Sequence, residues 1–196
     1  MARAFVAVVP PREVLDAVGK VSWRAMHRPR ELALPRLMSP RWTTRDQWHL
    51  TLQFLGTRVD LDEAAALLRG VRAEPPTMRL GGLGGFPSAK RANVLWVGAV
   101  EGARELRVLA ASVADVMTPL AGDPDALPFH PHLTVARLGR HADLRDAIGA
   151  TRRPDPVGPR WTVDRVVLFE SVTASTGAQY REHADVPLRP PAPEGP

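Results

Sequence analysis

The sequence HLTLQFLG at residues 49–56 returns as HLTVARLG at residues 132–139, with five of the eight positions identical. In each copy a histidine and a threonine stand two residues apart, and a leucine-glycine pair closes the stretch. Because side chains alternate between the two faces of a β-strand, each copy predicts a strand with an imidazole and a hydroxyl on one face and apolar residues on the other. If the two strands lie near a pseudo-two-fold axis, the two polar faces form one concave site.

The segments around this repeat predict a mixed order of strands and helices. Strands are expected at residues 4–9, 48–55, 78–83, 93–100, 132–138, 161–169 and 180–188. Helices are expected after the double proline at residues 10–11 and at residues 60–72, 106–117 and 143–148. Gly56 and Gly139 are expected to end the two repeat strands, and GGLGGFPSAKR is expected to form a hairpin turn. This order favours an α+β or α/β sandwich whose sheet curves around a groove.

The length and composition predict a soluble globular protein. A chain of 196 residues with 44% apolar residues can form one domain, or two small lobes that share a core. We expect a single two-lobed domain over residues 1–189 and a disordered proline-rich tail over residues 190–196. The first residues do not resemble a secretory signal, and no apolar run approaches the roughly 20 residues that span a bilayer. A cytoplasmic protein that does not bind membranes is therefore expected.

The charged residues favour an anionic partner, and the absence of cysteine excludes several chemistries. The net charge is +5, and the basic residues are almost all arginine because Lys20 and Lys90 are the only lysines. Arginine suits bidentate recognition of phosphate, although a coding preference for arginine would produce the same composition. With no cysteine the chain has no disulfide, no thiolate nucleophile and no zinc site built on thiolates.

Two histidines in one site suit the cleavage of a phosphodiester. Imidazole titrates near neutral pH, so one ring can accept a proton from the attacking water while the other donates a proton to the leaving oxygen. Hydroxyls of Thr51 and Thr134, with an arginine, would hold the non-bridging oxygens of the phosphate. The sequence shows a symmetric pair and does not say whether His49 or His132 is the acid.

The two motifs resemble those of a known family. WHLTLQFLG and FHPHLTVARLG look like the two HxTx motifs of the 2H phosphoesterases, most closely the RNA 2',3'-cyclic phosphodiesterases, once called 2'-5' RNA ligases. RAFVAVVPP, NVLWVG and VVLFES with Tyr180 resemble other strands of that family, so the resemblance covers residues 3–188. It implies an α+β fold of two pseudo-symmetric lobes, with curved antiparallel sheets lining a central groove, helices on the outside and no metal or organic cofactor.

The resemblance also implies a role for each site residue. His49 would donate a proton to the leaving O3', and His132 would accept a proton from water, which yields a 2'-phosphomonoester. Arg137 matches an arginine that serves the phosphate, together with Thr51 and Thr134. Strict alternation puts Arg137 on the face opposite His132, so a bulge or the strand end must reorient it. The expected partners are RNA with 2',3'-cyclic phosphate ends or small cyclic nucleotides, and a monomer suffices because one chain carries both histidines.

Other residues near the motifs are candidates for support of the catalytic groups or for base stacking. His130 favours a supporting role, with metal binding as the alternative because it stands two residues before His132. Phe54, Phe129, Tyr180 and also Trp96 could stack on a base, with core packing as the alternative. Alternation puts Phe54 on the apolar face of its strand.

Two alternative functions stay open from the sequence. One is a related two-histidine activity, such as 2'-5' RNA ligation or cleavage of 2'-5' oligonucleotides, which shares the same transition state. The other is a basic RNA-binding module without chemistry, against which the intact HLT triplet in both halves argues.

Overall fold

The computed structural model describes residues 2–36, 39–121, 129–150, 156–174 and 177–188, and the predicted disordered tail lies outside these residues. The strands form two antiparallel sheets. The first sheet has the order β3 (Leu50–Val59), β1 (Ala2–Val8), β8 (Arg165–Ala174) and β9 (Gly177–Pro187). The second has the order β2 (Arg41–Trp42), β6 (His132–Ala142), β5 (Ala92–Glu101), β4 (Thr77–Phe86) and β7 (Pro156–Thr162).

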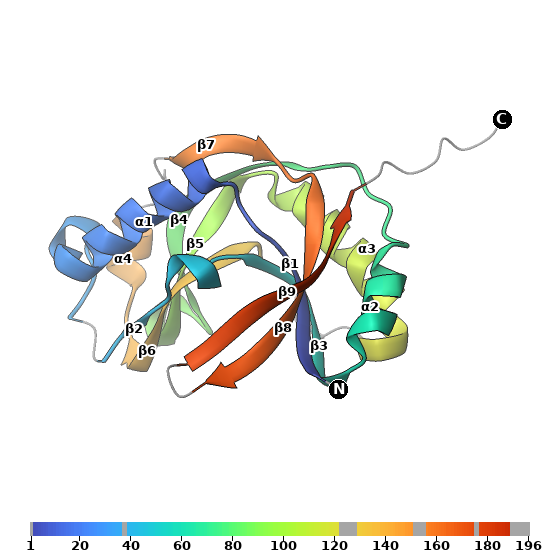
Figure 1. Cartoon of the computed structure of the whole chain (residues 1–196). Helices are drawn as coiled ribbons and strands as arrows, with labels where there is room; N and C mark the ends of the chain where they lie inside the picture. The colour runs from blue at the N-terminus through green and yellow to red at the C-terminus, as the bar shows by residue number, and fades with distance from the viewer. Residues whose placement is uncertain (1, 37–38, 122–128, 151–155, 175–176, 189–196) are drawn as a thin grey trace.

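The helices lie on the outer flanks of the two sheets (Figure 1). On one side α1 (Arg12–His27) lies against β7, and α4 (Arg145–Ala150) lies against β4. On the other side α3 (Ala103–Ala121) lies against β3, and α2 (Leu61–Leu68) contacts α3, β8 and β9. Short 3-10 turns occur at Pro29–Leu32, Arg45–Gln47 and Ala89–Arg91.

The two halves of the chain repeat one pattern. Apart from the two-residue strand β2, the first half reads β1, α1, β3, and the second half reads β5, α3, β6, so each motif strand follows a longer strand and a helix. Each motif strand then pairs antiparallel with the strand that opened its half, β3 with β1 and β6 with β5. The expected α+β architecture with two pseudo-symmetric lobes and external helices is confirmed.

Strand β1 is buried on both faces, and this positions the floor of the site. Ala4, Val6 and Val8 belong to the large core that also receives the buried faces of the helices. Phe5 and Ala7 point to the opposite face, where they pack with two residues of β8, Val167 and Phe169. A strand with two buried faces needs an uninterrupted apolar run, which explains the sequence of residues 4–9.

Several strand boundaries differ from the sequence-based expectation. Strands β3 and β6 continue past Gly56 and Gly139, and the single strand expected at residues 161–169 is divided into β7 and β8. The glycine-rich stretch lies mostly inside β4 rather than in a turn. There a Cβ at Gly84 would come within 2.0 Å of the Trp96 ring, so the glycine provides room for a large side chain on the neighbouring strand.

Candidate active site

Strand β3 contains a bulge directly after the threonine of its motif. Val6 of β1 pairs with Gln53, yet the next residue of β1, Ala7, pairs with Thr51, so Leu52 is an extra residue on β3. An extra residue interrupts the alternation of side chains along the bulged strand.

Strand β6 contains a bulge at the equivalent position of the second motif. Leu95 of β5 pairs with Ala136 and Trp96 pairs with Thr134, so Val135 is the extra residue. Val135 and Ala136 are both fully buried although they are neighbours in a strand. The repeat therefore extends to the backbone geometry.

The two bulges bring the sixth residue of each motif onto the face of the histidines. Phe54 and Arg137 both line the same groove as His49 and His132. Phe54 has an exposed fraction of 63%, so the expectation that it lies on the apolar face is wrong. For Arg137, a bulge is what brings it to the histidine face.

Both motifs meet in one groove of about 490 Å³ between the two sheets. It contains His49, Thr51, His132, Thr134 and Arg137, the five residues expected from the sequence to act on the phosphate. Tyr180 lines the same groove. The groove also contains residues that the sequence did not point to: Arg3, Phe5, Arg41, Thr43, Gln47 and Ser171.

His49 lies immediately before β3, among aromatic rings. Its ring stacks on Phe5 with centroids 4.8 Å apart, and the Tyr180 ring stands edge-on at 5.2 Å. Its Nε2 atom is 3.0 Å from the hydroxyl oxygen of Thr51. The pKa of His49 is lowered from 6.5 to about 4, mainly by burial. A hydrogen bond to the backbone of Gln47 raises this pKa, and the charges of His132 and Arg137 lower it further.

His132 is held in an equivalent way at the start of β6. Its Nδ1 atom is 2.7 Å from the carbonyl oxygen of His130, two residues earlier. Because a carbonyl oxygen only accepts hydrogen bonds, Nδ1 carries the proton and Nε2 is left to exchange one. The Phe86 ring stands edge-on at 4.8 Å. Burial holds the pKa of His132 below its usual range.

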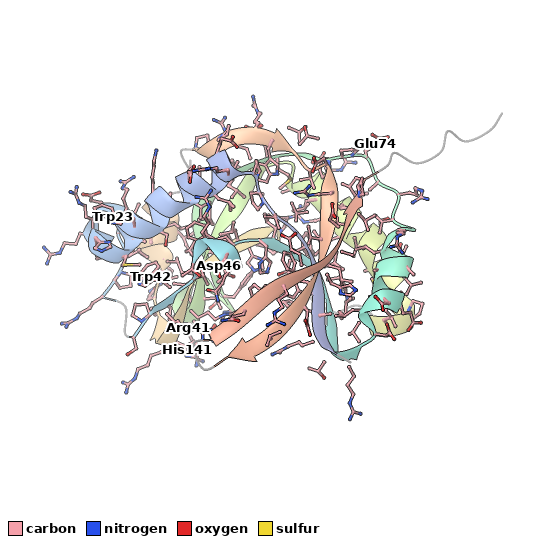
Figure 2. All side chains as sticks on the ribbon, in the orientation of Figure 1. Trp23, Arg41, Trp42, Asp46, Glu74 and His141 are labelled. Carbon is pink, nitrogen blue, oxygen red and sulfur yellow. The ribbon has the colours of Figure 1, made fainter. Side chains whose placement is uncertain are left out.

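Three arginines give the groove its charge. Arg3 of β1, Arg41 of β2 and Arg137 of β6 all line it, and within the described residues none of them forms an ion pair. Arg41 is directly opposite Arg137 in the pairing of β2 with β6. Figure 2 shows Arg41 at the end of the molecule where β8 ends and β9 begins. Unpaired guanidinium groups that converge in this way favour an anion.

Thr43 connects the two motifs. Its hydroxyl donates to the carbonyl oxygen of Thr134 at 2.8 Å and accepts from the indole N–H of Trp48 at 2.9 Å. Its backbone N–H donates to the carbonyl oxygen of Val135 at 3.0 Å. Through its side chain and its backbone N–H, this one residue joins the bulge of the second motif to the residue that precedes His49.

The remaining candidates take several places around the groove. His130 and Phe129 line a second cleft beside the groove, and Phe129 also packs against the large core. Trp96 covers the glycines of its sheet, with its ring 4.7 Å from that of His130. In the part of the chain that the structure describes, no three His, Cys, Asp or Glu side chains gather as metal ligands. No described helix is long and apolar enough to cross a membrane.

Arg3 and Arg41 were missed because they do not belong to either motif. Arg3 stands in the RAFVAVVPP stretch, where an arginine next to a buried strand was the only signal. Arg41 and Thr43 lie in the irregular, arginine-rich connection between the first helix and the first motif, which has no period to reveal a contact with β6.

Comparison with known proteins adds to this geometry. A family model described as the 2'-5' RNA ligase superfamily matches residues 19–174. The RNA 2',3'-cyclic phosphodiesterase of Escherichia coli K12 is 31% identical over 182 residues, which cover 91% of this chain and 92% of the relative. The RNA 2',3'-cyclic phosphodiesterase of Aeropyrum pernix is 39% identical over 103 residues, 50% of this chain and 58% of that relative, so this match spans less than two thirds of the relative.

A solved structure agrees over nearly the whole chain. The crystal structure of TT0787 of Thermus thermophilus is similar with a TM-score of 0.73 and 30% sequence identity. The similarity covers 96% of this chain and 98% of that chain.

Proposed function

This chain belongs to the 2'-5' RNA ligase superfamily, and from that membership we propose that it hydrolyses 2',3'-cyclic phosphate ends of RNA to 2'-phosphomonoesters. The observation that carries the proposal is the groove itself. Two imidazoles, each beside a motif threonine, share it with three arginines that have no ion-pair partner among the described residues. Two relatives named RNA 2',3'-cyclic phosphodiesterase support the choice of substrate.

In the proposed reaction one histidine accepts a proton and the other donates one. His132 Nε2 takes a proton from water as the water oxygen attacks phosphorus, and the bond from phosphorus to O3' breaks. His49 gives its proton to O3', which leaves a 3'-hydroxyl and a 2'-phosphate. Exchange of protons with solvent then restores both rings. Arg137 and the hydroxyls of Thr51 and Thr134 would hold the non-bridging oxygens as their charge grows.

The substrate itself supplies the charge that the donor needs. The pKa of His49 is about 4 in the free protein, so its ring is neutral at pH 7. A cyclic phosphate carries one negative charge, and an anion next to an imidazole raises the pKa of that imidazole. We therefore propose that binding and protonation of the donor are coupled.

A hydrolysis assay in the presence of EDTA tests the function. The substrate is a short RNA with a 2',3'-cyclic phosphate end, and phosphorus NMR identifies the product. We expect turnover to a 2'-phosphate, and a loss of about 10²- to 10⁴-fold in kcat in each of His49→Ala and His132→Ala. The matched control is His141→Ala, because His141 is exposed and lies outside the groove.

The other outcomes of this assay identify the alternatives. Full activity in His49→Ala and His132→Ala would reject the two-histidine mechanism. Joining of a 5'-hydroxyl RNA through a 2'-5' bond would favour ligation, which the description of the superfamily suggests. Binding of RNA without any turnover would favour a non-catalytic module. We further propose that one chain is sufficient, because both histidines line a groove within it.

A further inference from the structure

A second cleft, of about 520 Å³, opens beside the catalytic groove. It shares Thr51, Phe54 and His132 with the groove, so the two spaces are continuous at the catalytic residues. The cleft extends from there to one face of α3. A group attached to a phosphate in the groove can therefore extend into it.

The walls of the second cleft are aromatic and largely apolar. Phe54, Phe86 and Phe129 supply three aromatic side chains, and His130 adds an imidazole whose centroid is 5.8 Å from that of Phe86. The side formed by α3 carries small residues, Ala110, Ala111 and Ala114. Aromatic side chains beside a wall of alanines suit a nucleobase, which every RNA end carries.

Arg107 of α3 is the one arginine among the described residues that line this cleft. Its Nη1 atom donates to the carbonyl oxygen of Ala103 at 3.3 Å, and it forms no ion pair within the described ranges. Burial, and then the positive charge of Arg107, hold the pKa of His130 below its usual range, so the guanidinium lies within electrostatic reach of His130. Asp115 lines the cleft eight residues farther along the helix, about 12 Å away, which favours an anion at the Arg107 end.

We propose that the second cleft holds the terminal nucleoside of the substrate RNA, and that Arg107 binds the phosphodiester that joins this nucleoside to the preceding nucleotide. The inference rests on the proposed function. In hydrolysis the other reactant is water, so the terminal nucleoside is the only organic group attached to the reacting phosphorus. The next anion along the strand is its 5'-phosphodiester, and Arg107 is the cation that the described residues place at the cleft.

Two substrates that differ by one phosphodiester test this role. Adenosine 2',3'-cyclic phosphate lacks the 5'-phosphodiester, whereas the dinucleotide ApA with a 2',3'-cyclic phosphate contains it. We expect Arg107→Gln to raise KM for the dinucleotide by about tenfold, with kcat unchanged, because a charge-assisted hydrogen bond is lost. KM for the mononucleotide should not change. Arg104→Gln is the matched control, since it removes the same charge from α3 at a residue that does not line the cleft.

Two results would overturn the inference. In one, Arg107→Gln matches the wild type on both substrates; in the other, it impairs both equally, which would assign Arg107 to the reacting phosphate. Fluorescence anisotropy with labelled ApA that ends in a 2'-phosphate keeps the test separate from the proposed function. If no substrate is turned over, the proposed function fails. Weaker binding of this product by Arg107→Gln than by Arg104→Gln still supports the proposed role of the second cleft. Equal binding by the two variants rejects that role.

Discussion

The aromatic surroundings of His49 set the pH dependence that we expect of the reaction. Burial lowers the pKa of both His49 and His132, so in the free protein the proton donor loses its proton at low pH. kcat/KM follows the free protein, whereas kcat follows the complex, in which the bound anion raises both pKa values. We expect the alkaline limb of kcat to lie at higher pH than that of kcat/KM. Rates measured between pH 4 and 9 check this, and coincident limbs would contradict it.

The same residue predicts a loss of stability in acid. The pKa of His49 is 6.5 when exposed and about 4 in the folded protein, so between these values the unfolded chain binds more protons. The free energy of unfolding then falls as the pH drops from 6.5 to 4, by about 3 kcal/mol from this group. Urea unfolding at pH 7 and pH 4 should show a smaller drop for His49→Gln than for wild type. Equal drops would indicate that His49 is not buried in this way.

At the scale of single elements, the repeat was readable from the sequence, and a bulge was one of two ways expected to turn Arg137 toward His132, but the sequence did not give the positions of the bulges. Alternation from His49 and His132 correctly places Thr51 and Thr134 beside them, because no bulge intervenes. One residue after each threonine, the alternation of side chains between the two faces of the strand is shifted by the bulge. Leu52 and Val135 are residue types common in strands, so their identity does not indicate a bulge. Register depends on the neighbouring strand, which local sequence does not specify.

The connection that contains β2 is expected to contribute to stability and activity, because its residue Thr43 joins the two motifs. Thr43→Val keeps the shape but removes the hydroxyl that bonds Thr134 and Trp48. With the indole N–H of Trp48 left without its partner, we expect a loss of about 1–3 kcal/mol in the free energy of unfolding. kcat should also fall, because the motifs are no longer tied together. Thr43→Ser restores the hydroxyl and should recover both, as urea unfolding and hydrolysis rates can show.

For the whole molecule, the family resemblance predicted two lobes whose sheets line one central groove, but not the order of the strands in each sheet. The repeat indicated one strand per half with equivalent chemistry, and the structure places β3 and β6 in different sheets on one groove. The strand order β3-β1-β8-β9 depends on pairings between residues far apart in the chain, such as Phe5 with Phe169. Such pairings also bring Arg3 and Arg41 to the groove. The local periodicity of the sequence does not reveal these pairings.

The charge of the whole molecule makes the proposed activity dependent on salt. The net charge is +5, and the groove and the second cleft present Arg3, Arg41, Arg137 and Arg107 to the substrate. Each phosphate of a single strand that is neutralised contributes a slope of about −0.7 in log affinity against log salt. Between 50 and 200 mM NaCl we expect kcat/KM to fall about threefold for adenosine 2',3'-cyclic phosphate and about sevenfold for the ApA cyclic phosphate. The same dinucleotide with a neutral methylphosphonate linkage should return to the threefold change, because its second charge is gone. Equal salt dependence for all three substrates would mean that only the reacting phosphate meets a cation.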